Sequence, residues 1–127
     1  MDWLKQQAGE RNLDNIEVHA RVDDFGFVEV LSSADVHLAI LDERATGTCV
    51  PSKTYTAMAV GKPCLYLGAS SGQAAIDVMD ARAGHVFPSD GLKPFIESLR
   101  HLRAHEQERL EMGDRGLAYF SRERIFR

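Results

Sequence analysis

One segment of the sequence combines residue types suited to holding a phosphate. Thr46-Gly47-Thr48-Cys49 leads into Ser52 and Lys53, where a helix is expected to begin. The first N–H groups of a helix have no partner within it, and the helix dipole places partial positive charge there, so anions bind well. Lys53 adds a full positive charge, and the hydroxyls of Thr48 and Ser52 add donors. The alternative, a capped helix with a surface lysine, stays open from this spacing.

Two other loops are expected at the same edge of the fold, residues 21–26 and 68–72. In open α/β sheets, ligands bind beyond the carboxyl ends of the strands. The small residues of 68–72 would let the backbone approach a ligand closely, although an ordinary strand-to-helix turn has the same composition. The acidic pairs Asp23-Asp24 and Asp42-Glu43 are able to do acid–base work, but they also suit solvated loop caps.

The histidines and cysteines do not indicate a metal centre. His101 and His105 lie four residues apart on an expected helix, a spacing that suits zinc, but only Glu108 offers a third ligand nearby. Cys49 and Cys64 fit no metal-ligand spacing. We therefore expect no metal and no cofactor, and two reduced thiols in a cytosolic protein, with a disulfide between them as the alternative.

Composition favours one compact domain over a nucleic-acid-binding or membrane-spanning chain. The 127 residues are 44% hydrophobic and carry a net charge of −4. The only dense basic cluster, residues 122–127, is terminal and includes Glu123, whereas binding to phosphate backbones needs a broad positive surface. No apolar run approaches the roughly 20 residues that span a bilayer, and a signal peptide is not recognisable. A cytoplasmic location is expected.

Short apolar segments alternate with helix-like segments along the chain. The expected strands are residues 16–20, 36–41, 64–67 and 84–87. The expected helices are residues 2–11, a stripe over 27–34, residues 52–60, residues 73–82, a helix with Pro94 in its first turn that runs to 104, and residues 106–120. This alternation predicts an α/β fold, a Rossmann-like three-layer sandwich with a parallel sheet, as a single domain over residues 1–127.

Particular residues are expected to shape these helices. Gly61 suits a left-handed position at a helix end, and Pro63 blocks continuation. In the later helices we expect certain side chains to face inward, and two glycines to weaken the last helix. The inward residues are Ile76, Met79, Leu110, Leu117 and Phe120, and the glycines are Gly113 and Gly116.

Residues 32–68 resemble the core of the C-terminal, nucleotide-sugar-binding domain of retaining GT-B glycosyltransferases of the group 1, family 4 type. That family shows an Ala-Asp dipeptide before a strand, a Gly-containing loop, and a helix that ends in Ala-x-Gly-Lys/Arg-Pro. The matching residues are Ala34-Asp35, Gly47 and residues 59–63. The variant Pro-Ser-Lys-x-Tyr at residues 51–55 resembles a subgroup that acts in bacterial surface-polysaccharide synthesis. The flanks agree, so the resemblance covers nearly the whole chain.

The resemblance implies donor-binding residues. In the family, amides of the loop before the helix meet the sugar and diphosphate, and the matching positions are Gly47, Thr48, Cys49 and Val50. Ser52 and Lys53 would then face the diphosphate. The family often carries two glutamates eight residues apart, and their matching positions are Thr48 and Thr56, so ribose binding is expected to differ. Arg21 and Val22 match the part that contacts the base.

The resemblance also implies missing parts. Family members carry an N-terminal domain that binds the acceptor, and their C-terminal domain opens with strands that have no counterpart here. The chain is therefore expected to be a truncated GT-B half, a fragment or one subunit of a split enzyme, peripheral at the inner membrane only through its missing half. Unpaired sheet edges would favour a companion chain, a homodimer or a rearranged strand order.

These observations predict the donor-binding portion of a glycosyltransferase that moves a sugar from a nucleotide sugar, a UDP-sugar by preference, to a polysaccharide or lipid-linked acceptor. No catalytic residue can be assigned, because the acceptor side lies outside this chain. The alternative is a non-catalytic Rossmann-like binding module or subunit. A receiver-like signalling domain would need an acidic pair upstream of Asp42, and that pattern is not met.

Overall fold

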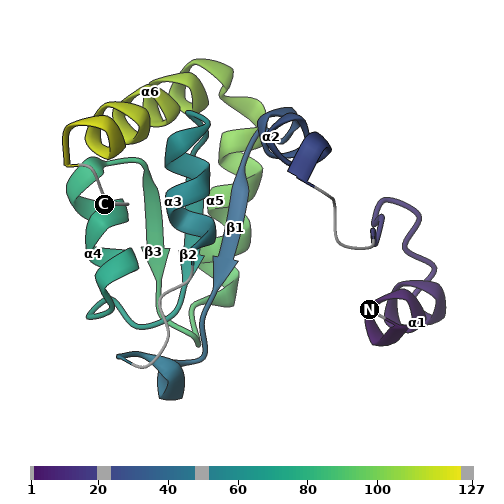
Figure 1. Ribbon diagram of the computed structural model, residues 1–127. Coiled ribbons are helices and arrows are strands. Elements are labelled where there is room, and N and C mark those ends of the chain that lie inside the picture. The colour runs from purple at the N-terminus through teal and green to yellow at the C-terminus, as the bar shows by residue number, and fades with distance from the viewer. Residues whose placement is uncertain (1, 20–23, 48–51, 124–127) are drawn as a thin grey trace.

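The computed structural model describes residues 2–19, 24–47 and 52–123. Helices and strands alternate from β1 onward, as expected (Figure 1). The elements are α1 (Asp2–Glu10), α2 (Asp24–Ser33), β1 (His37–Ile40), the short 3-10 helix η1 (Glu43–Ala45), α3 (Lys53–Ala59), β2 (Cys64–Leu67), α4 (Gln73–Ala81), β3 (Gly84–Phe87), α5 (Leu92–Ala104) and α6 (Glu106–Glu123).

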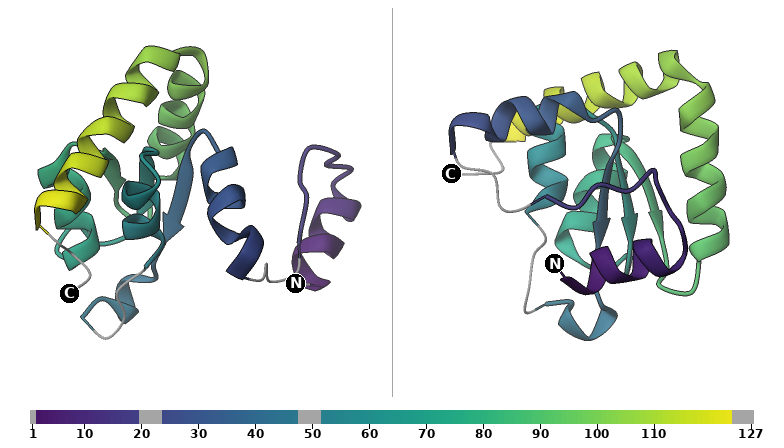
Figure 2. Two further views of the ribbon diagram at one scale, coloured as in Figure 1. Left: turned by 45° about the horizontal axis from the view of Figure 1, so that its top comes forward. Right: turned by 90° about the vertical axis from the view of Figure 1, so that its right-hand side faces the viewer.

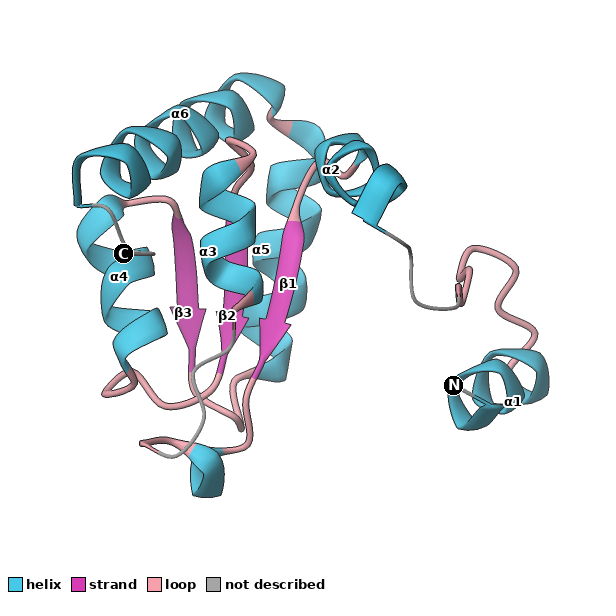
Figure 3. Ribbon diagram, in the orientation of Figure 1, coloured by secondary structure: helices cyan, strands magenta, loops and turns pink. Residues whose placement is uncertain are grey.

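The three strands form one parallel sheet in the order β1-β2-β3 (Figure 3). Leu65 of β2 pairs with Leu38 of β1 and with His85 of β3. Helices cover both faces of the sheet, with α3 and α4 on one side and α5 on the other, while α6 crosses its upper end (Figures 1 and 2). The expected three-layer α/β arrangement with a parallel sheet is confirmed.

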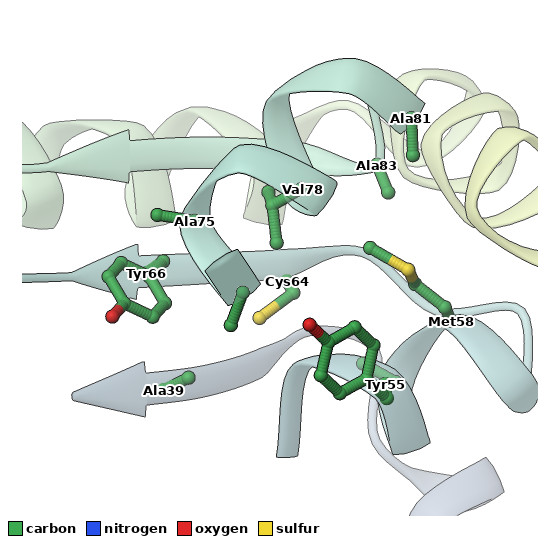
Figure 4. Close-up of a cluster of buried hydrophobic side chains, with 11 residues drawn as sticks. Ala39, Tyr55, Met58, Cys64, Tyr66, Ala75, Val78, Ala81 and Ala83 are labelled. Atoms are coloured by element: carbon green, nitrogen blue, oxygen red, sulfur yellow. The ribbon is translucent and has the colours of Figure 1, made fainter. Parts of the chain in front are cut away.

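Each face of the sheet has its own hydrophobic core. On one face, Ala39, Cys64 and Tyr66 pack with side chains of α3 and α4, including Tyr55 and Met58 (Figure 4). On the other face, Leu65 and Leu67 pack with Phe95 and Leu102 of α5 and Met112 of α6. The alternation of side chains along β2 between these two clusters explains why every residue of that strand is buried.

The glycines of α6 allow close packing. A Cβ atom at Gly113 would collide with the carbonyl oxygen of Gly61, and one at Gly116 would lie 2.9 Å from the Cβ atom of Ala83. Gly61 itself has φ +70 at the end of α3, which confirms the expected left-handed position. The absence of two side chains therefore brings α6 directly against the end of α3 and the start of β3.

Several predictions of inward-facing residues are wrong. Met79 is 44% exposed and Ile76 is only half-buried, because α4 turns its alanines and Val78 toward the sheet. In α6, Leu110 and Leu117 are exposed, because the tight crossing turns the helix face that carries Gly113 and Gly116 inward instead. Phe120 does pack against the core, as expected.

The expected strand over residues 16–20 is also wrong. Residues 16–19 form no strand, and residue 20 lies outside the described residues. A strand needs a neighbour for its N–H and C=O groups, and this segment lies away from the sheet with α1 (Figure 1). α1 has no buried residue. α2 lies beside the start of β1, where the His37 ring hydrogen-bonds the Leu31 carbonyl at 2.9 Å.

Candidate active site at the carboxyl edge of the sheet

Two pockets line the edge where all three parallel strands end. One, of about 450 Å³, is lined by Ile40, Leu41, Asp42, Glu43, Arg44, Leu67 and Ser89. The other, of about 430 Å³, is lined by Glu43, Gly68, Ala69, Ser70, Ser71, Val86 and Pro88. Both volumes suit a small-molecule ligand. This is the edge of an open α/β sheet where ligands bind, at the lower end of the strands in Figure 1.

Glu43 lines both pockets. It lies at the start of η1, just beyond the end of β1, and its Oε1 accepts a long hydrogen bond of 3.5 Å from the backbone N–H of Ser89, beyond β3. The side chain therefore reaches across the edge from one outer strand to the other. A carboxylate in this place is able to accept hydrogen bonds from ligand hydroxyl groups.

The carboxylate of Asp42 is paired with Arg44. Its carboxylate accepts hydrogen bonds from Arg44, with Oδ2 lying 2.8 Å from Nη2, and from the Arg44 backbone N–H at 2.9 Å. These hydrogen bonds lower the pKa of Asp42 to about 2. Asp42 and Arg44 neutralise each other at the surface, so Glu43 is left as the carboxylate of this edge that no cation pairs with in the described part of the chain.

The loop after β2 has a glycine at each end, and the first of them is required by the packing. A Cβ atom at Gly68 would lie 2.8 Å from the carbonyl oxygen of Leu41, so only glycine lets this loop pass the end of β1. Gly72 occupies the N-cap position of α4 and brings no side-chain oxygen to its first N–H groups. Thr46 lies close by, and its buried hydroxyl oxygen has no hydrogen-bond partner among the described residues. Uncapped helix N–H groups beside a pocket favour an anionic or polar ligand.

The structure describes only some of the residues that were expected from the sequence to bind the donor. Gly47 adopts φ +93 with open space around it, and Ser52 and Lys53 are exposed at the start of α3. Ser52 occupies the N-cap position, but its hydroxyl makes no capping hydrogen bond, and the Thr56 hydroxyl donates to the Lys53 carbonyl at 2.9 Å. Thr48, Cys49, Val50, Arg21 and Val22 lie outside the described residues.

Neither pocket at this edge is lined by Ser52, Lys53 or Thr56. The structure brings together the loop 68–72 and the acidic pair Asp42-Glu43 instead. Sequence reasoning placed both at the carboxyl edge and weighed a ligand-binding role for each against an ordinary turn or a solvated cap. The signal for both was their position directly after two buried apolar segments that were expected to be parallel strands.

Comparison with known proteins decides the family. A protein-family model described as glycosyl transferase-like matches residues 2–127. The chain belongs to this family. No curated protein and no solved structure matches the chain. The expected kinship with glycosyltransferases is thereby confirmed at the level of the family.

This glycosyl transferase-like chain also contains a buried polar network that the sequence did not suggest. Asp77 of α4 is 7% exposed. Its carboxylate accepts hydrogen bonds from the hydroxyl groups of Tyr55 at 2.6 Å and Tyr119 at 2.8 Å, and from the Gln73 amide at 3.2 Å. Burial, followed by the hydrogen bond to Asp77, raises the pKa of Tyr55 and raises that of Tyr119 to about 12. The network joins α3, α4 and α6 and lines neither pocket.

The remaining candidate residues of this glycosyl transferase-like chain show local roles. Cys64 is a free thiol inside the core, and burial raises its pKa to about 12, which makes it unreactive at neutral pH. His101 contacts the Glu108 carboxylate at 2.6 Å, and its ring stacks on His105 with centroids 3.9 Å apart. Within the described ranges, no group of three or more His, Cys, Asp or Glu side chains is placed to hold a metal ion.

None of the helices in the described residues is both long enough and apolar enough to cross a membrane.

Proposed function

We propose that this chain is the donor-binding part of a retaining GT-B glycosyltransferase that uses a UDP-sugar. The observation that carries the proposal is the pair of adjoining pockets at the carboxyl edge of the parallel sheet, with Glu43 lining both. Membership in a glycosyl transferase-like family supports a sugar donor as the ligand. The acceptor is proposed to be a polysaccharide or lipid-linked sugar of a bacterial surface, bound outside this chain.

The two pockets suggest that the sugar and the diphosphate of the donor bind at different places along the edge. The hydroxyl groups of the transferred sugar are strong donors toward a carboxylate, and Glu43 supplies one at the centre of the edge. This carboxylate is proposed to take the role of one of the glutamates that related enzymes often carry at the positions of Thr48 and Thr56. The diphosphate is placed near the uncapped start of α4 and the loop 68–72, where Glu43 also lines the pocket and would weaken its binding.

The donor-binding residues predicted from the sequence belong to the same proposal. Gly47, Thr48, Cys49 and Val50, together with Ser52, Lys53 and Thr56, are proposed to contact the sugar and the diphosphate of the donor. Arg21 and Val22 would contact the base. Catalysis would then come from electrostatic stabilisation of the leaving diphosphate, without a metal ion and without a general base from this chain.

A partner that covers β1 is part of this proposal. β1 is an edge strand, and its Leu38 and Ile40 side chains are exposed on the face that α5 covers at β2 and β3. Ile40 is 67% exposed. Exposed apolar side chains beside an unpaired edge favour association with a companion chain or a second copy. A cytoplasmic location fits this role.

A non-catalytic binding module is the second candidate. It is favoured by one observation: Ser52 and Lys53 line neither pocket at the carboxyl edge. In that case the edge would hold a neutral polar ligand and no nucleotide.

A thermal-shift titration with UDP, UDP-glucose and UDP-N-acetylglucosamine separates these candidates. A ligand at a hundredfold excess over its Kd stabilises the folded state by about 2.7 kcal/mol, which for a chain of this length raises the Tm by roughly 10 °C. The variant Glu43→Gln should bind the UDP-sugars more weakly than the wild type does, without a loss of affinity for UDP. Glu97→Gln, on the exposed surface of α5, is the matched control. An unchanged Tm with all three nucleotides at millimolar concentration refutes the proposed function and favours the binding module.

A further inference from the structure

A third pocket lies at the opposite end of the sheet from the candidate active site. It has a volume of about 390 Å³ and is lined by Asp35, Val36, Leu99, Arg100, Arg103 and Arg109. Asp35 and Val36 directly precede β1, while the arginines come from the second half of α5 and the start of α6, where these helices meet at the top of Figure 1. Strands of four residues span about 13 Å, so this pocket is separate from the carboxyl edge.

The charges that line this pocket are unbalanced. Three guanidinium groups face one carboxylate, and no ion pair joins any of these arginines to an acidic side chain in the described part of the chain. Arg100 and Arg103 are three residues apart on α5, where like charges repel each other. Arg109 is fixed in place, because its Nη1 donates to the carbonyl oxygens of Leu102 at 2.5 Å and Arg103 at 3.0 Å.

Capping of α5 accounts for only part of this cluster. Arg103 lies in the last turn, and Arg109 hydrogen-bonds two of the last carbonyl groups, so both stabilise the negative end of the helix dipole. Arg100 lies before the last turn, where the dipole effect has faded. Its charge in the same pocket needs another explanation, and an anion bound between the guanidinium groups supplies one.

We propose that this pocket binds a phosphate monoester attached to an apolar group. Guanidinium groups form paired hydrogen bonds with phosphate oxygens, and a phosphate dianion matches the net charge of the lining better than a carboxylate does. Val36 and Leu99 form an apolar wall for the remainder of the ligand. The phosphate belongs either to a soluble organic phosphate or to a lipid headgroup at a membrane surface, and the chemistry of recognition is the same for both.

The test measures binding of hexyl phosphate, inorganic phosphate and hexanoate by calorimetry to the full chain. Hexyl phosphate is expected to bind more tightly than either of the other two. The variant Arg100→Gln/Arg103→Gln should bind it about tenfold more weakly or worse, whereas Lys5→Gln/Lys93→Gln, which removes the same charge from exposed positions outside the pocket, should bind it as the wild type does. Sedimentation with phosphatidic acid vesicles, compared with phosphatidylcholine vesicles, tests the lipid source with the same variants.

The outcomes are distinct. Binding of hexyl phosphate or of phosphatidic acid vesicles that only the arginine variant loses supports the pocket. Binding to neither, or equal loss in both double variants, overturns it. If the arginine variant merely melts at lower temperature without any ligand effect, the arginines are helix caps and the proposal fails. Saturating UDP and the variant Glu43→Gln should leave hexyl phosphate binding unchanged, so this test is independent of the proposed function.

Discussion

Removal of the Asp77 carboxylate should destabilise the fold by about 3 kcal/mol. The carboxylate accepts three hydrogen bonds, and hydrogen bonds to charged groups contribute about 1.5–3 kcal/mol each, but much of this is offset because the carboxylate had to leave water. In Asp77→Ala the Tyr55 hydroxyl loses a 2.6 Å contact inside the core, and that loss is the largest single cost. The measurement is urea unfolding followed by circular dichroism.

A double-mutant cycle tests the reasoning. Tyr55→Phe alone should cost about 2 kcal/mol, and combining it with Asp77→Ala should cost less than the sum by about 1.5 kcal/mol, because the two groups interact directly. Asp80→Ala, at an exposed position of the same helix, is the control and should change stability by less than about 0.5 kcal/mol. Additive costs, or an Asp77→Ala variant as stable as Asp80→Ala, would show that the network contributes little to the fold.

Three further predictions follow from the packing and the charges. Gly113→Ala should destabilise the fold by at least about 2 kcal/mol in urea unfolding, whereas Gly9→Ala, where a Cβ atom meets open space, should not. Because burial raises the folded-state pKa of Tyr119 to about 12, above its ordinary value of 10.0, the folded state retains the proton to higher pH. Stability should therefore decline as the pH rises from 10.0 toward 12, and less so in Tyr119→Phe. Ile40→Lys should reduce self-association in sedimentation velocity if a second copy covers β1, and an unchanged sedimentation coefficient would exclude that partner.

The sequence predicted the sheet well where local signals agreed. β2 and β3 have the expected bounds, because buried apolar segments there are separated by Gly61, Pro63 and Gly68, whose backbone roles are local. The strand expected at residues 16–20 failed because alternation shows which residues could face a core without supplying a neighbouring strand. The prediction of which helix faces are buried also failed. The buried side of α6 is decided by where Gly113 meets Gly61, a contact between residues far apart in sequence.

The candidate site could likewise be predicted from the sequence only in part. The loops at the carboxyl edge could be predicted, because parallel strands must end together. That Glu43 rather than Lys53 lines the pockets could not be predicted, since it depends on how η1 folds back toward Ser89. The Asp77 network is of the same kind, as its members lie 22 and 42 residues from Asp77 in the sequence.

The charge at the carboxyl edge leads to one more prediction about the donor. Glu43 is the carboxylate there without a paired cation in the described residues, so it should weaken binding of a bare diphosphate while strengthening binding of a ligand with hydroxyl groups. In Glu43→Gln, UDP should therefore bind somewhat more tightly and UDP-sugars more weakly. Lys53→Ala should weaken both, by about fivefold, since a unit charge at 4 Å in a solvated site contributes about 1 kcal/mol.

Lys93→Ala is the control for Lys53→Ala, because Lys93 is exposed on α5 and lines none of the three pockets described. Calorimetric titration with UDP and with UDP-glucose measures both affinities for the wild type and for each variant. Opposite shifts for UDP and UDP-glucose in Glu43→Gln require the carboxylate to lie beside both a phosphate and a hydroxyl group. Parallel shifts would mean that Glu43 acts only through the fold of η1, and the division of the edge into a sugar side and a phosphate side would then be wrong.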